Sequence, residues 1–329
     1  MGHIAVLGNG SWGTALAMVL AENKHRVKLW GRDAVQIKDM QQRRENRRYL
    51  PNVRLDDLIE VQEGTGSVVR GAEVAIFSVP AQAFRSVLRD VKDELADEAI
   101  LVNVAKGIEL HSLMRLSEIA EEENTADHYV VLSGASHAEE VGRGLPTAIV
   151  AASQDKVSAK YVQDLFMNDK FRVYTSDDVV GVELGGALKN IIALGAGISD
   201  GAGFGDNAKA ALMTRGLAEI IRLGVRLGAK PETFSGLTGI GDLIATCTSV
   251  HSRNRSCGLM IGEGLPTREA IAKVGMVVEG ILTTEAAYAL ARREQIEMPV
   301  TEAIYYVIKE TVKVDEAITG LMNREKKHE

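Results

Sequence analysis

A lysine surrounded by apolar residues is the side chain of this sequence best suited to proton transfer. Lys189 lies in the segment ELGGALKNIIAL, residues 183–194, and Glu183 falls on a different face of the expected helix. Desolvation disfavours a charged ammonium group and lowers its pKa, which suits a lysine to general acid–base catalysis. A lysine whose charged head reaches the surface is the alternative. The pattern favours acid–base chemistry at Lys189, with Asn190 beside it.

Two further charged residues occur at positions that favour a functional role over an ordinary solvent-exposed charge. Lys106 follows the apolar strand predicted at residues 100–104. Side chains just past the C-terminal end of a strand face the ligand crevice of a doubly wound sheet, although a plain loop lysine is the alternative. Asp242 stands in the otherwise uncharged run 236–250. Because an unpaired buried carboxylate is costly, we expect Asp242 to face a partner such as Lys189 or a bound polyol.

Two loops carry groups that could hold substrate oxygen atoms. The segment SGASHAEE, residues 133–140, follows a predicted strand, and its backbone N–H groups could receive a substrate oxygen. Ser136 and Glu139 also fit a capping box, which is ordinary helix initiation. The segment SRNR, residues 252–255, combines arginine and amide donors that suit a phosphate, or else forms an exposed cationic turn.

The glycines at the N-terminus form the most specific motif. Residues 8–13 read GNGSWG, directly after an apolar strand and before a helix. In this pattern Gly8 allows a tight turn, Gly10 lets the backbone approach a pyrophosphate, and Gly13 allows close packing of helix and strand. The helix N-terminus adds free N–H groups and a partial positive charge. We therefore predict a dinucleotide site rather than a glycine-rich turn without a ligand.

The residues after the second strand bear on which dinucleotide is bound. An acidic residue there holds a ribose 2′-hydroxyl, whereas an arginine receives a 2′-phosphate. Asp33 lies at the expected distance, 20 residues past Gly13, but Arg32 precedes it and Asp33 could simply cap the next helix. The pattern favours NADP through Arg32, with NAD as the alternative.

Elements of two kinds must position these residues. Strands are predicted at 4–7, 27–30, 74–79, 100–104, 130–133, 148–151 and 172–174, with helices between them at 14–23, 82–92, 113–122 and 155–167. This alternation predicts an α/β Rossmann-type domain with a mostly parallel sheet, residues 1–176. Helices at 182–200, 208–227, 283–293 and 300–308 then predict an all-α domain, residues 177–329, after a capping segment at 175–178.

Composition limits the partners of the chain. Its 329 residues favour two domains, and 38 basic against 45 acidic residues give a net charge of −7, which argues against nucleic acid or an anionic membrane. Two cysteines, Cys247 and Cys257, make no disulfide framework, and no zinc-type spacing exists, so a cytoplasmic protein without a metal is expected. No run approaches the ~18 apolar residues of a spanning helix.

Several motifs together, in this order, resemble the bacterial NAD(P)-dependent glycerol-3-phosphate dehydrogenase family, over nearly the whole chain. They are residues 8–15, 106–109, 133–140, 183–190, 207–211, 236–246, 252–254 and 278–280. One departure is Ala135, where the family usually has proline; its loss removes a constraint on φ in that loop.

The resemblance implies a cytoplasmic homodimer that interconverts dihydroxyacetone phosphate and sn-glycerol 3-phosphate, the backbone for phospholipid synthesis. It implies that Lys189 is the proton acceptor, with Asn190 alongside, and that Lys106 touches both cofactor and substrate. The other implied cofactor contacts are Ser11, Trp12, Arg32, Ala138, Arg253, Val277 and Glu279. The other implied substrate contacts are Gly134, Ser136, Asp242, Ser252, Arg253 and Asn254. In the reductive direction a hydride reaches the ketone carbon, Lys189 delivers a proton to the alkoxide, and Lys106 stabilises its charge.

Two alternatives stay open beside this resemblance. Another dehydrogenase with a Rossmann and a helical domain, such as a ketopantoate reductase or a 3-hydroxyacid dehydrogenase, would not obviously need the phosphate-binding segment 252–254. A sensor that binds NADP without turnover would not need a general acid at Lys189.

Overall fold

The computed structural model describes residues 3–123, 125 and 127–326, so the outermost residues of both predicted domains lie outside the described part. The chain separates into two compact units. The first comprises Met1–Lys106 and Met114–Glu183, and the second comprises Gly107–Leu113 and Leu184–Glu329.

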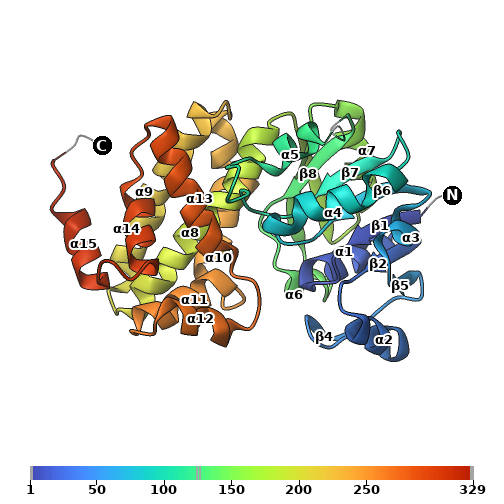
Figure 1. Cartoon of the computed structure of the whole chain (residues 1–329), viewed down its shortest axis with the longest axis horizontal. Helices are drawn as coiled ribbons and strands as arrows, with labels where there is room; N and C mark the ends of the chain where they lie inside the picture. Colours follow the sequence, from blue (N-terminus) through green and yellow to red (C-terminus); the bar gives the residue numbers. More distant parts are fainter. Residues whose placement is uncertain (1–2, 124, 126, 327–329) are drawn as a thin grey trace. The chain divides into compact units, whose positions relative to one another are not determined.

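The first unit is built on an eight-stranded sheet of order β10-β9-β8-β7-β6-β1-β2-β5. Figure 1 labels β1, β2, β5, β6, β7 and β8 of this sheet. Its strands are β1 (His3–Leu7), β2 (Val27–Trp30), β5 (Ile59–Gln62), β6 (Ala72–Phe77), β7 (Ile100–Asn103), β8 (Tyr129–Ser133), β9 (Thr147–Ala152) and β10 (Phe171–Ser176). Neighbouring strands are parallel except β8 and β9, which are antiparallel. The predicted mostly parallel Rossmann-type sheet is confirmed.

Both faces of the sheet are buried along its inner strands, which explains why those strands are recognisable in the sequence. In β1, Ile4 and Val6 join the core on one face, and Ala5 and Leu7 join the core on the other. The first core also holds α1 (Ser11–Glu22), α2 (Ala34–Arg43), α6 (Ala138–Val141) and α7 (Lys156–Phe166). The second holds α3 (Thr65–Val69), α4 (Phe84–Val91) and α5 (Leu116–Glu122). Strands buried on two faces are continuous apolar runs, which is the pattern that predicted them.

The elements missed in this unit lie where the pattern is weaker. Strand β5 is an edge strand of sequence IEVQ that alternates buried and more exposed residues over only four positions. The hairpin of β3 (Glu45–Asn46) and β4 (Leu50–Arg54) forms a separate two-stranded sheet. Helix α2 has an apolar face of only two buried residues, Ile37 and Met40, so its periodicity is faint.

The chain is all-helical from residue 179 on, which confirms the predicted second fold class. Its helices are α8 (Val179–Gly201), α9 (Gly205–Arg226), α10 (Asp242–Thr248), α11 (Arg253–Gly262), α12 (Thr267–Val274), α13 (Glu279–Glu294), α14 (Pro299–Ile308) and α15 (Val314–Met322), joined by the short helical turns η3 (Pro231–Ser235) and η4 (Leu237–Gly241). Helices α10, α11, α12 and α15 were not predicted. They are short and lie among glycines and polar residues that interrupt the 3.6-residue period.

Most of helix α8 belongs to the second unit. Within the described residues it is the one helix long and apolar enough to cross a membrane by length and composition, but 94% of its most apolar window is buried in the protein. It extends beyond its uninterrupted uncharged stretch, residues 190–199, because it also includes Lys189 and Glu183. At its N-terminus the Asp178 carboxylate accepts the Gly181 N–H at 2.9 Å, within the predicted capping segment.

Candidate functional site

The glycine-rich loop lies where the order of the sheet reverses. Strand β1 pairs with β2 on one side and β6 on the other, and Gly8 follows it with φ 118°. A Cβ on Gly8 would lie 2.3 Å from the Ser78 carbonyl oxygen, and a Cβ on Gly13 would lie 1.9 Å from the Gly8 carbonyl oxygen. A Cβ on Gly10 would meet nothing within 4 Å. Only glycine fits the two packed positions, while the loop is open at Gly10, where a ligand can approach the backbone.

Helix α1 begins at Ser11, directly after this open loop. Its first N–H groups have no partner within the helix, as at any helix N-terminus. The indole Nε1 of Trp12, in the same turn, is buried and has no hydrogen-bond partner among the described residues. A buried donor left unpaired is rare, and a bound polar group would satisfy it. Ala138, the first residue of α6, is buried and packs in the same apolar core as α1.

The two candidate residues after β2 have different environments. The Asp33 carboxylate accepts the N–H groups of Val35 at 3.0 Å and Gln36 at 3.2 Å, so Asp33 is the N-cap of α2. This confirms the capping interpretation of Asp33. Arg32 is exposed, and it forms no hydrogen bond or ion pair within the described part of the chain. Its guanidinium is therefore available to a ligand.

Lys106, Gly134 and Ser136 meet at one carbonyl group. The Lys106 Nζ donates to the Gly134 oxygen at 2.8 Å, and the Ser136 Oγ donates to the same oxygen at 3.0 Å. Gly134 has φ 147°, and a Cβ there would lie 2.9 Å from the Ile149 Cα. The capping box expected from Ser136 and Glu139 is wrong, because α6 begins only at Ala138 and the Ser136 hydroxyl is used inside the loop.

Lys189 is buried in the second unit and paired. It is 6% exposed, and its Nζ donates to the Asp242 carboxylate and, at 2.6 Å, to the Thr246 hydroxyl. Thr246 in turn donates to the Asp242 carbonyl oxygen at 2.6 Å, which turns its lone pair toward Lys189. The prediction that Asp242 faces Lys189 is confirmed. Thr246 was missed, because a threonine one helical turn after Asp242 carries no signal of its own.

The amide neighbours of Lys189 form a chain through three helices. Asn254 in α11 donates to the Asn190 Oδ1 at 2.9 Å, and its own Oδ1 accepts the Gly280 N–H at 2.9 Å. A Cβ on Gly280 would lie 2.7 Å from the Asn190 carbonyl oxygen. The start of α13 therefore packs directly on α8 beside Lys189. Glu279, the residue before Gly280, begins α13, and Val277 is exposed in the preceding loop.

The basic segment 252–255 is a helix start and not the loop that was predicted. Ser252 is the N-cap of α11, and its hydroxyl accepts the Arg255 N–H at 3.2 Å. Arg253 is exposed in the first turn, whereas Arg255 forms two hydrogen bonds to Asp200 at 2.7 and 2.9 Å. Arg253 and the first N–H groups of α11 thus combine a side-chain cation with a helix N-terminus, an arrangement that binds anions.

Each unit thus brings together its own share of the predicted residues. Lys106, Gly134 and Ser136 meet in the first unit, and Lys189, Asn190, Asp242 and Asn254 meet in the second.

Both cysteines are free and buried, and burial raises the pKa of Cys247 to about 12 and that of Cys257 to about 11, so neither is a nucleophile at neutral pH. Among the described residues, no group of three or more His, Cys, Asp or Glu could hold a metal ion.

Comparison with known protein families gives two matches that together span most of the chain. Residues 3–159 match the N-terminal model of the NAD-dependent glycerol-3-phosphate dehydrogenases, and residues 178–319 match the C-terminal model of the same family. A glycerol-3-phosphate dehydrogenase [NAD(P)+] of Bacillus pumilus is 52% identical, with 100% of this chain and 96% of that protein covered. The enzyme of the same name from Pelotomaculum thermopropionicum is 54% identical, with 100% and 95% covered.

Solved structures agree with the sequence comparisons. A glycerol-3-phosphate dehydrogenase of Coxiella burnetii is 38% identical with a TM-score of 0.95, covering 98% of this chain and 99% of that one. A ketopantoate reductase of Ralstonia eutropha is 16% identical with a TM-score of 0.62, covering 94% and 98%, which is a likeness of fold alone. The chain has a mostly parallel sheet followed by a helical unit, and the two full-length relatives are more than 50% identical to it. This chain therefore belongs to the NAD(P)-dependent glycerol-3-phosphate dehydrogenase family of oxidoreductases.

Proposed function

We propose that this dehydrogenase prefers NADPH over NADH in its reduction of dihydroxyacetone phosphate to sn-glycerol 3-phosphate, and that Lys189 is its general acid. The observation that carries the proposal is the buried Lys189 ammonium held by Asp242 and Thr246. A neighbouring carboxylate favours the charged form of an ammonium group, so a proton is in place to be donated.

The first unit has the features needed to hold the dinucleotide. The turn at Gly8, the open loop at Gly10 and the packed Gly13 present the N-terminus of α1 to a pyrophosphate. Arg32 at the end of β2 would receive the 2′-phosphate. The proposed contacts in this unit are Gly8, Gly10, Ser11, Trp12, Gly13, Arg32, Lys106 and Ala138. The bound nicotinamide supplies the hydride; the protein supplies position and electrostatics.

We propose a role in the reduction for each of two lysines. As the carbonyl oxygen of the ketone becomes an alkoxide, Lys189 gives it a proton and is left as a neutral amine. The Lys106 ammonium, which donates to the Gly134 carbonyl oxygen, stabilises the developing negative charge electrostatically. Gly134, Ser136, Asn190 and Asp242 orient the substrate, and Ser252, Arg253 and Asn254 hold its phosphate. Arg253, Val277 and Glu279 also contact the cofactor.

The proposal also covers the domains, the oligomeric state, the compartment and the metabolic role of the enzyme. Residues 1–176 are the dinucleotide-binding domain and residues 177–329 the catalytic domain. The enzyme acts as a cytoplasmic homodimer, without a metal and without nucleic acid or membrane partners, and supplies the glycerophosphate backbone for phospholipid synthesis. The burial of the apolar helix α8 in the protein supports the part of this proposal that concerns the membrane.

An assay of NADPH oxidation tests the proposal directly. We expect rapid oxidation with dihydroxyacetone phosphate and none with ketopantoate or a 3-oxoacid. Turnover of one of those acids in its place would assign the chain to another dehydrogenase class. NADPH binding without oxidation by any of these substrates would support a sensor.

Replacing Arg32 by alanine should raise the KM for NADPH and leave that for NADH almost unchanged. One hydrogen bond to a charged group contributes ~1.5–3 kcal/mol, so the expected change is roughly 10- to 100-fold. Arg26 is also exposed but precedes β2, at the opposite end of the strand, so Arg26→Ala is the matched control. Equal losses for the two cofactors would reject the 2′-phosphate role.

Replacing Arg253 by alanine should weaken discrimination for the phosphorylated ketone. The preference for dihydroxyacetone phosphate over dihydroxyacetone, measured as a ratio of kcat/KM, is expected to fall by roughly 10- to 100-fold for one lost charged hydrogen bond. Arg268→Ala is the control, because Arg268 is an exposed arginine in the first turn of α12. A variant that keeps the full preference would show that the phosphate is held elsewhere.

A further inference from the structure

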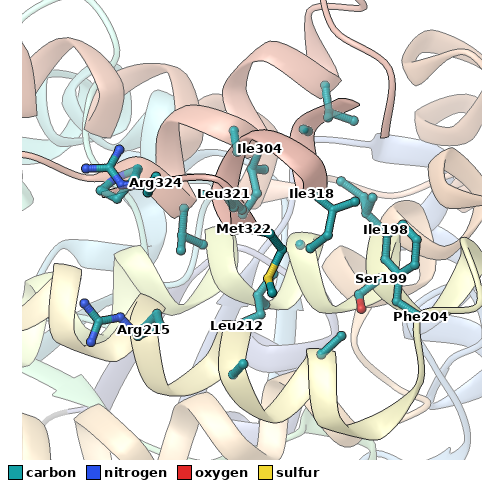
Figure 2. Close-up of a pocket in the computed structure, with 18 of the residues that line it drawn as sticks. Ile198, Ser199, Phe204, Leu212, Arg215, Ile304, Ile318, Leu321, Met322 and Arg324 are labelled. Atoms are coloured by element: carbon teal, nitrogen blue, oxygen red, sulfur yellow. The ribbon is translucent and has the colours of Figure 1, made fainter. Parts of the chain in front are cut away.

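An apolar cavity in the second unit is separate from all the residues proposed for catalysis. Its volume is about 330 Å³, and it lies among α8, α9, α14 and α15 (Figure 2). Its walls are largely aliphatic and aromatic and include Ile198, Phe204, Leu212, Ile304, Ile318 and Leu321. Concave apolar sites of this size, with a few polar groups, are typical of small-molecule binding.

Helix α15 closes this cavity only in part. Ile318 and Leu321 line the cavity, yet no residue of α15 is fully buried. Met322, which also lines the cavity, is 78% exposed. The apolar face of α15 is therefore turned toward a space that the chain itself does not fill, and a further apolar group there would bury it.

Two of the arginines that line the cavity lie at one end of it. Figure 2 shows Arg215 and Arg324 at that end and Ile198 and Phe204 at the other. Arg215 is exposed and forms no ion pair with any carboxylate of the described residues. Arg324 is 3.3 Å from the exposed Glu297 carboxylate. An anionic group can therefore bind at this end without displacing a buried ion pair.

The acidic residues that line the cavity do not cancel this cationic end. Glu219 is buried, but its carboxylate already accepts the N–H groups of Val300 at 2.6 Å and Thr301 at 3.0 Å. It therefore caps the N-terminus of α14. Glu325 is exposed next to Arg324 in the chain. A ligand carboxylate can thus reach the Arg215 guanidinium from the cavity mouth, where two charged donors favour an anion.

We propose that this cavity binds an unbranched aliphatic carboxylate, the chemistry of a free fatty acid. The carboxylate lies against Arg215 and Arg324, and the hydrocarbon chain extends toward Ile198 and Phe204. The arrangement matches such a molecule because it has one cationic end and an apolar interior. Neither a nucleotide nor a sugar phosphate fits, since either would place several polar groups against apolar walls.

Titration calorimetry of the full-length protein with decanoate tests the ligand class. The decanoate concentration is kept below the level at which decanoate forms micelles. We expect saturable binding at one site per chain. At ~0.8 kcal/mol per buried methylene, the four extra methylenes of decanoate should make it bind roughly 200-fold more tightly than hexanoate. Decanol, which lacks the charge, should bind roughly 10-fold more weakly than decanoate. Absence of saturable decanoate binding, or equal binding of hexanoate, would overturn the proposal.

Variants on α15 and α9 locate the site. Ala317→Trp places a large side chain in the cavity and should abolish decanoate binding, whereas Thr319→Trp on the exposed side of α15 should not. Arg215→Gln should weaken decanoate binding roughly 10-fold through loss of a charged hydrogen bond and leave decanol binding unchanged. Arg226→Gln, on α9 but outside the cavity, is its control. NADPH oxidation with dihydroxyacetone phosphate should stay at the wild-type rate in all four variants.

A second copy of the chain is the competing occupant, and the same variants distinguish it. If Ala317→Trp lowers the molar mass in solution while the wild type binds no decanoate, the cavity is an interface between copies and the proposal is wrong. If Ala317→Trp fails to fold, the decanoate affinities of Arg215→Gln and Arg226→Gln decide whether the cavity binds a carboxylate. Decanoate affinity that is equal in those two variants would reject the carboxylate site.

Discussion

Lys189→Met is expected to lower kcat by ~10²–10⁴-fold, because it removes the proton donor of the reduction while it keeps the length and apolar character of the side chain. NADPH affinity should not change, since the glycine loop and Arg32 lie in the first unit and Lys189 lies in the second. The measurement is kcat for dihydroxyacetone phosphate reduction, together with NADPH affinity from a fluorescence titration. A variant with near wild-type kcat would move the proton transfer to Lys106.

The pairing of Lys189 determines the control that this experiment needs. Lys189→Met leaves the Asp242 carboxylate, with a side chain 2% exposed, next to Thr246 and without its cation. Removing one partner of a buried ion pair costs ~3–5 kcal/mol, so the single variant can lose activity through instability. The double variant Lys189→Met/Asp242→Asn removes the carboxylate charge together with the ammonium. If it folds, binds NADPH and is inactive while Asp242→Asn alone keeps activity, loss of the proton donor explains the result.

The residues that were predicted from the sequence share a local signal. Gly8, Gly10 and Gly13 stand in a fixed spacing after a strand, and Lys189 is a single charge in an apolar helix. Both signals arise within about one helical turn or loop, so they need no knowledge of the fold. The same holds for the inner strands of the sheet such as β1, β6 and β8, because burial on two faces makes each of them a nearly continuous apolar run.

The features that were missed or mistaken depend on contacts distant in sequence. Thr246 is 57 residues from Lys189, and only the packing of α10 on α8 brings them together. The segment 252–255 was taken for a loop because its charges suggest exposure, but Arg255 is paired with Asp200, 55 residues away. Ser136 fitted a capping box by spacing, yet its hydroxyl is used by the Gly134 carbonyl. Local spacing cannot predict which of several partners a polar side chain will have.

Glu183 is the clearest case of a distant network that spacing did not reveal. In the sequence it is a charge six residues from Lys189. In the structure its buried carboxylate accepts the Arg115 Nη1 at 2.9 Å, the Ser117 N–H at 2.9 Å and the Tyr129 hydroxyl at 2.7 Å. The pKa of Tyr129 is raised well above its ordinary value, mainly by burial and secondarily by the adjacent Glu183 carboxylate. The phenol therefore stays protonated and donates to Glu183.

Glu183→Ala should therefore destabilise the first unit by ~3–5 kcal/mol, because it leaves the Arg115 guanidinium without its buried partner. Trp12 and Trp30 are the two tryptophans of the chain and both lie in this unit, so denaturant unfolding followed by tryptophan fluorescence reports on it specifically. Glu118→Ala is the matched control: Glu118 also pairs with Arg115 but is 40% exposed, and its loss should cost only about 1 kcal/mol, the value of an exposed pair or a helix cap. Equal shifts for the two variants would mean that the Glu183 network contributes no more than a surface ion pair. In that case the stability of the first unit would rest on the apolar packing of its sheet.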